Sequence, residues 1–485
     1  MPLSDVAWAI QDMNDRAGHL TLCRNYYEGR HRPVLPAGKT LNRLLRELLE
    51  DLTDNLCDDV VNEPTDRLTI AGWDAPNRPE LAQAAAELWG ENRGDARSPK
   101  VHRDMWMAGD GFAIVQENAQ GRPRMFVQQP EQLAVRYSTD QPDVIECAAK
   151  AWKAGSRWRI NVYLADPSHP EGPAALERYA SKGTSPTGGL PSVKAFQLVT
   201  EEEGYGLPAE ELPAFPVFHF PADEVGRYGR SALTPVIPLQ DVLNKSIGDM
   251  VVTMEDTAMP QRYAIGVQVE YDPETGLEIN PFTGPSGKAK VWRTGSEKAQ
   301  FGQFAQADLS GFLEVQDRWR AEIGRKGYLP AHSVNPTTSL PPSGVSLLVA
   351  DGRQVKRVKN AQTIVGQTWR ELMAQMLTMA GHACTADDLE IVWGPAETRD
   401  EQALVDTLTA KVALGLPKLQ ALIEMGYDPD DAAEWTAQAQ AQAELDAANA
   451  VDAMGGRLSP VPLTPGGILP PPASPPAGAA EPATP

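Results

Sequence analysis

The longest regular pattern of apolar positions in the chain lies between residues 341 and 380. Apolar residues recur there at steps of three and four, with Gly352 and Gln362 filling the two gaps, at Val345, Leu348, Val355, Val358, Val365, Trp369, Leu372, Met376 and Met379. Such steps predict one continuous helix face. Gly381 follows as a stop signal, and no proline interrupts the pattern after Pro342. At about 1.5 Å per residue the helix would reach roughly 55 Å, which is typical of a strut rather than a compact catalytic domain.

Two shorter helical patterns flank a β-like segment upstream of this helix. Residues 238–259 carry an apolar face, with Pro238 at the start and Pro260 at the end. The next stretch alternates strictly, with Tyr263, Ile265, Val267, Val269 and Tyr271 on one side, and predicts a half-buried strand with a return strand at 289–293. A second helix is predicted over residues 309–325. We therefore expect a stalk, in which one helix leads out, a β tip turns the chain and another helix returns.

The rest of the chain predicts a mixed body and a helical end. Four helices are predicted at 4–17, 41–62, 79–92 and 98–109, the last with Ser98 as its cap, and short strands follow over 112–220. This order indicates an antiparallel sheet decorated by helices, an α+β fold. After the long helix we expect a short strand at 389–393 and helices at 398–415, 417–426 and 430–454. Residues 455–485 are rich in proline, alanine and glycine and should be disordered.

Charge and cysteine content narrow the possible functions. The 485-residue chain has a formal net charge of −21 and a pI of about 4.8, which argues against a surface that coats nucleic acid. Its four cysteines are scattered and form no CxxC pair, so reduced thiols are expected. No signal peptide and no apolar run long enough for a membrane span are evident.

No motif predicts catalysis, a cofactor or a metal. The phosphate-binding GxxxxGK[ST] pattern is absent, and Gly109-Asp110-Gly111 is too short for a dinucleotide loop and favours a tight turn. His382 and Cys384 could begin a metal site, but no second pair accompanies them. Adjacent acids such as Asp58-Asp59 do not share a helix face, so a solvated surface is the simpler interpretation.

The order of local patterns resembles the portal, or head-to-tail connector, proteins of tailed bacteriophages, and most of all the SPP1-type portals of phages with long non-contractile tails. The matching elements are Tyr26-Tyr27-Glu28-Gly29, Val60-Val61-Asn62-Glu63, Gly72-Trp73, Trp89 with Asn92, Gly109-Asp110-Gly111-Phe112, Gly229-Arg230-Ser231-Ala232-Leu233, Pro260-Gln261-Arg262-Tyr263 and Asn335-Pro336. Each element alone is weak, and their order and spacing over residues 5–455 carry the resemblance.

The resemblance implies a phage portal fold with an α/β wing, a two-helix stem, a small β clip, a long spine helix and a helical crown. Its parts map to 1–237 (first part of the wing), 238–260 and 308–327 (stem helices), 261–307 (clip), 328–343 (tunnel loop), 344–381 (spine), 382–454 (crown) and 455–485 (tail).

It also implies a function without enzyme activity or cofactor. A homo-oligomeric ring, commonly of twelve subunits, would occupy one capsid vertex of the virion after assembly in the host bacterial cytoplasm. Double-stranded DNA would enter and leave through its channel during packaging and ejection. The expected partners are the terminase large subunit, a head-completion adaptor protein, and the major capsid and scaffolding proteins, with no membrane contact.

Two sets of residues are candidates for the DNA channel. The polar loop residues suit weak, sequence-blind contact with a moving backbone; they are His332, Ser333, Asn335, Thr337, Thr338 and Ser339. The basic cluster on the long helix consists of Arg353, Lys356, Arg357 and Lys359. We expect this cluster to lie beside the tunnel loop, near passing phosphates or a neighbouring subunit's acids, and the alternative is a solvated helix face or intersubunit salt bridges. Because every phosphate contact adds salt-sensitive affinity, only a few cations are compatible with sliding DNA.

Two rival functions remain open from the sequence. A hydrolase acting on phosphodiesters would need an acidic metal-binding pocket, and no tight constellation of His, Asp and Glu is visible. A portal fused to capsid-maturation functions is a second alternative. The short stretch of chain after the predicted crown argues against it.

Overall fold

The computed structural model forms two compact units, unit 1 (Met1–Thr398) and unit 2 (Arg399–Pro485). The residues that the structure describes are 3–32, 53–165, 172–183, 189–199, 206–223, 227–258, 262–266, 270–271, 273–276, 278–279, 297–303, 308–334, 344–397, 401–425, 427 and 429–455. Each unit is therefore described by itself.

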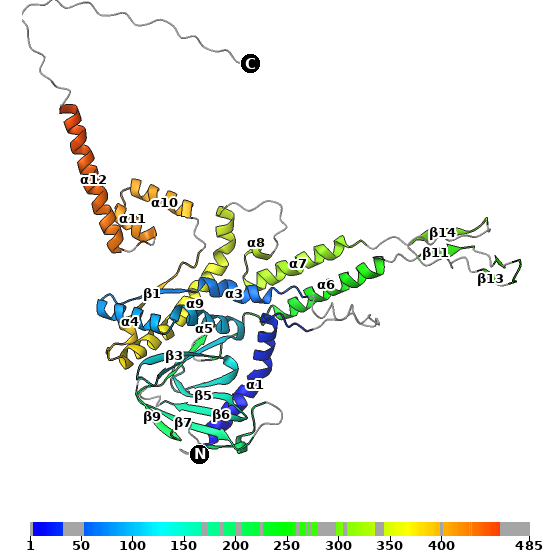
Figure 1. The fold of residues 1–485 in the computed structure, drawn as a ribbon, viewed down its shortest axis with the longest axis horizontal. Helices are drawn as coiled ribbons and strands as arrows, with labels where there is room; N and C mark the ends of the chain where they lie inside the picture. The colour runs from blue at the N-terminus through cyan, green and yellow to red at the C-terminus, as the bar shows by residue number, and fades with distance from the viewer. Residues whose placement is uncertain are drawn as a thin grey trace, which may run out of the picture. The chain divides into compact units, whose positions relative to one another are not determined.

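The two largest sheets of unit 1 are antiparallel (Figure 1). One has the order β10-β2-β3, from β2 (Asp110–Glu117), β3 (Pro123–Gln128) and β10 (Val217–Pro221). The other has the order β4-β5-β6-β7-β8, with β9 also paired to β7; its strands are β4 (Leu133–Tyr137), β5 (Ile145–Ala154), β6 (Arg157–Leu164), β7 (Ala174–Ser181), β8 (Phe196–Leu198) and β9 (Ala209–Leu212). The predicted antiparallel α+β body is confirmed.

The helices around these sheets depart from the predicted boundaries in three places. Helix α1 (Leu3–Tyr27) continues past residue 17, because Leu20, Cys23 and Tyr26 extend its buried stripe. Helix α3 (Cys57–Arg67) begins at Cys57, so residues 53–56 of the predicted second helix are not helical, whereas residues 41–52 lie outside the described residues. Helix α4 (Pro79–Glu91) agrees with the prediction.

Helix α5 (Gly94–Ala108) begins earlier than predicted, and Ser98 is not its cap. The cap position is Arg93, which has left-handed backbone angles (φ 52°, ψ 48°), and Ser98 is buried inside the helix. The sequence signal was misleading because Ser98-Pro99 resembles a helix start, whereas Pro99 is the sixth residue of α5 and lies inside the helix.

An antiparallel helix pair, α6 (Ile237–Ala258) and α7 (Ser310–Gly327), confirms both helices of the predicted stalk (Figure 1). The predicted single strand over 263–271 is wrong. It is divided into β11 (Arg262–Ile265) and β12 (Glu270–Tyr271), because Gly266 takes a positive φ of 73° that ends β11. The return strands are β14 (Gln300–Gln303), paired with β11, and β13 (Glu278–Ile279), paired with β12, whereas the predicted return strand at 289–293 lies outside the described residues.

The long helix is present as α9 (Gly344–Met379), 36 residues, and its apolar face forms much of the main core. Trp369 is fully buried there and packs against Phe220 and Trp89, with ring centroids 4.6 and 5.6 Å away. After α9, β15 (Glu390–Trp393) pairs antiparallel with β1 (Ile70–Asp74), which ties residues 390–393 into unit 1. A short helix, α8 (Ala331–Val334), precedes α9.

Unit 2 contains the helices α10 (Glu401–Ala413), α11 (Lys418–Met425) and α12 (Pro429–Gly455). Residues 456–485 lie outside the described residues. Throughout the part of the chain that the structure describes, no helix combines the length and apolar character that crossing a membrane would require.

Candidate channel residues and the base of the stem

The predicted basic cluster lies on α9, but its members have different surroundings. Arg353 and Lys356 are exposed, and Lys359 forms an ion pair with Glu397 at 2.7 Å. Lys356 makes no ion pair with any carboxylate in the described ranges. Arg357 is only partly exposed and is engaged within its own chain. Arg353 and Lys356 are therefore exposed on α9, whereas Arg357 packs inside unit 1.

Arg357 binds the C-terminal end of α7. Its guanidinium donates to the carbonyl of Gly327 at 3.1 Å and lies over the ring of Trp106, 4.4 Å from the centroid. Burial lowers the pKa of Arg357 to about 10, while the neighbouring Asp223 and Tyr328 oppose that shift, so the group stays charged at neutral pH. An Arg in this position satisfies an orphan helix carbonyl and favours the negative end of the helix dipole.

Tyr328 connects this arrangement to Arg353. It caps α7 with left-handed backbone angles (φ 64°, ψ 21°), a conformation that a bulky residue adopts at a cost. The guanidinium carbons of Arg353 and Arg357 lie 4.7 and 5.0 Å from its ring centroid. These cation–π contacts hold the turn between α7 and α8 against α9.

The loop candidates are described only at their beginning. His332 and Ser333 belong to the backbone of α8, and Ser333 is exposed. Asn335, Thr337, Thr338 and Ser339 lie outside the described residues. The structure thus brings Arg353 and Arg357 together around Tyr328 and leaves the loop candidates as predictions.

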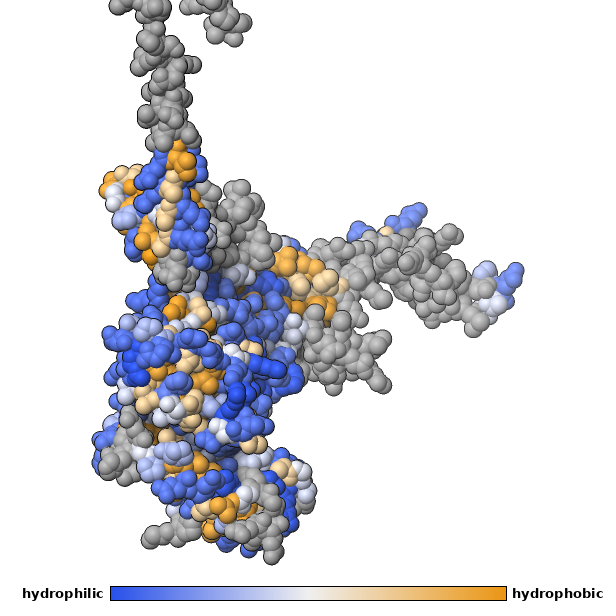
Figure 2. Space-filling model, turned by 60° about the vertical axis from the view of Figure 1, so that its left-hand side comes forward, coloured by the Kyte–Doolittle hydropathy of each residue, from blue (hydrophilic) through white to orange (hydrophobic). Residues whose placement is uncertain are grey.

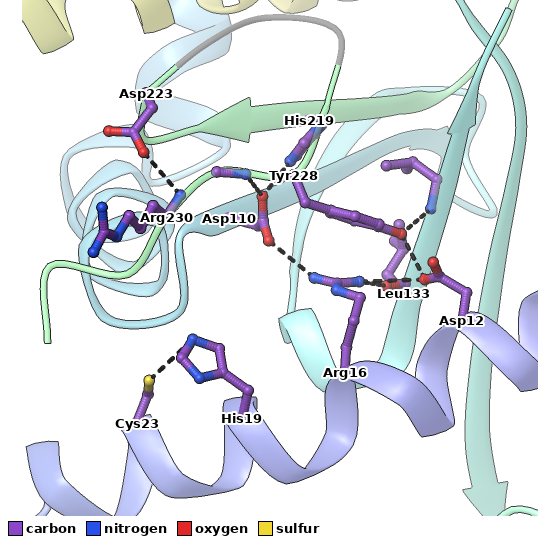
Figure 3. A network of polar contacts seen from close by, with 12 residues as sticks. Asp12, Arg16, His19, Cys23, Asp110, Leu133, His219, Asp223, Tyr228 and Arg230 are labelled. Carbon is purple, nitrogen blue, oxygen red and sulfur yellow. Dashed lines mark hydrogen bonds and ion pairs between the residues drawn. The ribbon is translucent and has the colours of Figure 1, made fainter. Parts of the chain in front are cut away.

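A buried polar network, which sequence analysis missed, lies where the chain enters α6 (Figure 3). Asp110, 2 % exposed, accepts hydrogen bonds from Arg16 at 2.9 Å, from the Nε2 of His219 at 2.9 Å and from the backbone N–H of Gly229 at 2.7 Å. The Nδ1 of His219 lies 2.7 Å from the hydroxyl of Tyr137. A neutral imidazole protonated at Nε2 satisfies both contacts, with Tyr137 as the donor.

Tyr228 links this network to α1 and the second sheet (Figure 3). Its hydroxyl donates to Asp12 at 2.7 Å and accepts from the backbone N–H of Val135 at 2.9 Å, and Arg16 lies 3.6 Å above its ring. Burial raises the pKa of Asp12, and the hydrogen bond from Tyr228 opposes that shift. Arg16 is a charged residue within the apolar stripe of α1, between Met13 and Leu20. A charge at such a buried position was the sequence signal that could have revealed this network.

Two glycines allow the backbones to meet at this place. A Cβ on Gly229 would lie 2.2 Å from the carbonyl oxygen of Gly109, and a Cβ on Gly109 would lie 2.4 Å from that of Gly229. Gly109 also has a positive φ of 97°. Next to them, the Ser231 hydroxyl donates to the Met107 carbonyl at 2.5 Å, which continues the clamp. The two weak motifs around Gly109 and Gly229 are thus two sides of one contact that fixes the start of α6.

Within the described residues, no group of three or more His, Cys, Asp and Glu side chains is placed to hold a metal ion. Cys23, Cys57 and Cys147 are buried free thiols, and burial raises the pKa of each. Cys23 Sγ lies 3.6 Å from the Nε2 of His19 (Figure 3), but burial raises the pKa of this thiol and so disfavours the thiolate that a nucleophile needs.

Comparison with known proteins identifies the family. The family profile described as "Phage portal protein, SPP1 Gp6-like" matches residues 7–449. The curated portal proteins of Mycobacterium phages D29 and L5 are 26 % and 27 % identical over 210 residues, a match that covers 41 % of this chain and 42 % of each relative. The chain therefore aligns with less than half the length of these relatives.

Solved structures with a similar fold are subunits of gene transfer agent particles. The neck of a native particle, computed with C12 symmetry, aligns with 84 % of this chain and 99 % of that chain at 14 % identity and a TM-score of 0.45. The neck of an empty particle, computed with C6 symmetry, aligns at 14 % identity and a TM-score of 0.47, covering 83 % of this chain and 97 % of that chain.

An α+β body, a helix pair bearing a β tip and a long helix that begins after a short connecting segment define a portal-type subunit, a structural component of phage particles. The chain belongs to the SPP1 Gp6-like family of phage portal proteins, because the family profile matches nearly its whole length. The α+β portal fold expected from the sequence is confirmed.

Proposed function

We propose that twelve copies of this chain form a ring at one capsid vertex and that double-stranded DNA passes through the channel of the ring during packaging and ejection. Family membership supports a portal function, and the observation that carries the ring is the apolar surface of the α6–α7 pair. Val242, Leu313 and Val315 are 41, 53 and 46 % exposed on these two helices. Apolar groups that are gathered on one helix pair favour burial against another copy.

A groove along the same helices strengthens this proposal. It has a volume of about 500 Å³ and is lined by Val242, Phe312, Val315 and Trp319, with Lys245, Asp249 and Asp308 at polar positions. Figure 2 shows the apolar side chains of this region in orange, beside a surface that is mostly hydrophilic. Ring formation would cover the groove with the equivalent helices of a neighbouring subunit.

The proposed parts of the subunit follow the predicted boundaries. We infer that α6 and α7 are the stem, residues 261–307 the clip, residues 328–343 the tunnel loop, α9 the spine of the wing and residues 382–454 the crown. Within the last segment, residues 382–397 belong to unit 1. The network around Asp110 and Gly229 would then fix the stem to the wing.

We propose that Arg353 and Lys356, the exposed members of the cluster, lie close to the DNA path, whereas Arg357 acts by holding the α7 end that leads into the tunnel loop. The polar residues at the loop, from His332 to Ser339, would contact the sliding backbone weakly. Two cations per subunit limit the salt-dependent affinity, so the duplex can still move.

The proposed partners are assigned by the family role. The clip would receive the terminase large subunit during filling and a head-completion adaptor afterwards, and the wing would contact the major capsid and scaffolding proteins. Assembly would take place in the host bacterial cytoplasm, in a phage with a long non-contractile tail, and the chain itself would carry no enzyme activity, because the terminase would hydrolyse ATP.

End-on class averages of the purified full-length protein by negative-stain electron microscopy test the ring. We expect closed rings with a central hole, and replacing Leu313 and Val315 by Ser should shift the protein toward monomers. A compact monomer at every workable concentration, with or without other virion proteins, would refute the proposal.

The channel residues need a separate test. Replacing Arg353 and Lys356 together by Gln should leave rings intact and change DNA packaging or retention, and shortening the 335–340 loop should do the same. Filled heads at normal yield from both variants would remove the assigned DNA contacts while leaving the ring proposal untouched.

A further inference from the structure

A cavity of about 550 Å³ lies in unit 1 between the end of α1, helix α5 and strand β3. The proposed function does not use this cavity. Cations dominate its polar lining, in a chain whose net charge is −21. Tyr27, Phe126 and Val127 supply apolar surface, and Phe126 is 43 % exposed.

The cations form a stripe along α5. Arg97, Lys100 and Arg103 are separated by three residues each, so they project from neighbouring positions on one helix face. In the described ranges, neither Lys100 nor Arg103 pairs with a carboxylate, and the buried Nε of Arg103 has no hydrogen-bond partner. Burial lowers the pKa of Arg97, and repulsion from Arg124 and Arg93 acts in the same direction. With four cations and two carboxylates, the lining of the cavity is net positive and favours an anionic ligand.

The carboxylates in the lining offset the stripe only in part, and Asp104 interacts electrostatically with both Arg24 and Arg103. Asp104 lies 3.6 Å from Arg24, which is already bonded to Glu131 at 2.5 and 2.9 Å. Burial raises the pKa of Asp104 to about 6, while the Arg24 charge opposes that shift. Glu28 pairs with Arg30 outside the stripe.

Strand β3 adds hydrogen-bonding groups of its backbone to the same cavity. It is an edge strand, because the order of its sheet is β10-β2-β3. The backbone N–H of Met125 donates to the side chain of Asn92, and its backbone carbonyl accepts from Arg97. Both backbone groups of Met125 therefore point away from β2. Backbone direction alternates along a strand, hence the N–H and C=O of Val127 also face outward, toward the cavity that Val127 lines.

We propose that this cavity binds an extended acidic peptide segment of a partner protein, which pairs with the edge of β3 at Val127 and places carboxylates against Lys100 and Arg103. Strand addition supplies main-chain hydrogen bonds, and the cations and Phe126 select acidic and apolar side chains. A peptide is favoured over nucleic acid, because a peptide backbone can pair with the free edge of β3 and a DNA duplex cannot.

Fluorescence anisotropy with full-length protein tests the site. The probe is a fluorescein-labelled hexapeptide, Glu-Glu-Phe-Glu-Val-Glu, and the controls are the same peptide with Lys in place of Glu and a version that is N-methylated at alternate amides. We expect saturable binding of the acidic peptide alone, since N-methylation removes the donors that strand addition needs.

Paired variants locate the binding. Replacing Lys100 and Arg103 by Gln should weaken binding by about tenfold or more, because two charge-assisted contacts are lost. Replacing Lys153, on β5, and Lys194, just before β8, by Gln makes the same charge change at exposed positions away from the cavity lining and should leave the affinity unchanged.

Several outcomes would overturn the inference. Equal binding of the Lys peptide, or equal weakening by the two variant pairs, would show that no specific acidic site exists. Unchanged binding of the N-methylated peptide would exclude addition to β3. Displacement of the probe by a short DNA duplex at lower concentration than by unlabelled peptide would assign the site to nucleic acid.

Discussion

The clearest quantitative prediction concerns His102, which is fully buried on α5. The indole Nε1–H of Trp369 donates to its Nε2 at 3.0 Å, and the two rings meet edge to face at 5.7 Å. Burial lowers the pKa of His102 to about 4, while a backbone contact to Leu68 opposes the shift. The folded protein therefore holds a neutral imidazole whose acceptor nitrogen is already occupied.

The pH dependence follows from the difference between the two states. In the unfolded chain His102 takes up a proton near pH 6.5, whereas in the folded chain it stays neutral until about pH 4. The contribution of neutral His102 to the free energy of unfolding is fully present above pH 6.5. It is lost progressively as the pH falls from 6.5 toward 4. At pH 5 the loss amounts to about 2 kcal/mol, and at pH 8 it is close to zero.

Urea unfolding, followed by far-UV circular dichroism at fixed protein concentration, measures this term when wild type is compared with His102→Gln. A Gln carbonyl can accept the Trp369 hydrogen bond but does not titrate. The difference in unfolding free energy between the two proteins should therefore change by about 2 kcal/mol between pH 8 and pH 5. Other groups, including Asp104, cancel because both proteins contain them.

His102→Leu provides the matched control. It leaves the buried indole N–H of Trp369 unpaired, which should cost about 1–3 kcal/mol at every pH. A wild-type versus Gln difference that is constant from pH 8 to pH 5 would refute the assignment of a neutral, proton-excluding His102.

Three further predictions concern the base of the stem, each measured by urea unfolding at pH 7.5. Gly229→Ala should destabilise unit 1 by about 1–3 kcal/mol, because its Cβ would lie 2.2 Å from the Gly109 carbonyl oxygen. The control Gly18→Ala should be neutral or stabilising, because a Cβ at this position of α1 has no atom within 4 Å. Equal effects of the two substitutions would exclude the backbone contact. Asp110→Asn should cost about 3 kcal/mol, since Arg16 loses its buried partner, and an unchanged midpoint would contradict the network. Arg357→Gln should cost about 1–2 kcal/mol through the lost contacts to Trp106 and Gly327, whereas Lys356→Gln should cost nothing; equal costs would show that Arg357 has no special packing role.

Periodicity alone determined the elements whose apolar positions are local and unbroken. Apolar residues at steps of three and four predicted α9, α6 and α7. Burial of one helix face requires this spacing whatever the surrounding structure is. The order of strands and helices likewise predicted the α+β class, and the ordered weak motifs predicted the family.

Tertiary contacts decided the points at which local signals were ambiguous. Ser98 resembled a helix cap, yet α5 begins at Gly94 and buries Ser98. The alternation from Tyr263 to Tyr271 satisfied a strand pattern, yet Gly266 has a positive φ and ends β11, so that β11 pairs with β14 and β12 with β13. A period-two pattern cannot reveal which glycine the surrounding backbone forces to a positive φ.

The roles of charged residues also depended on the fold. Arg353, Lys356 and Arg357 are equivalent in the sequence, but only Arg357 meets Trp106 and the end of α7, because a partner 30 positions away or more is brought close by packing and not by spacing. For the same reason Asp110, Arg16 and His219 could not be joined from the sequence, since they lie on three separate elements. The chain's local patterns determined its elements, and long-range burial decided which charges support the structure and which stay free to act.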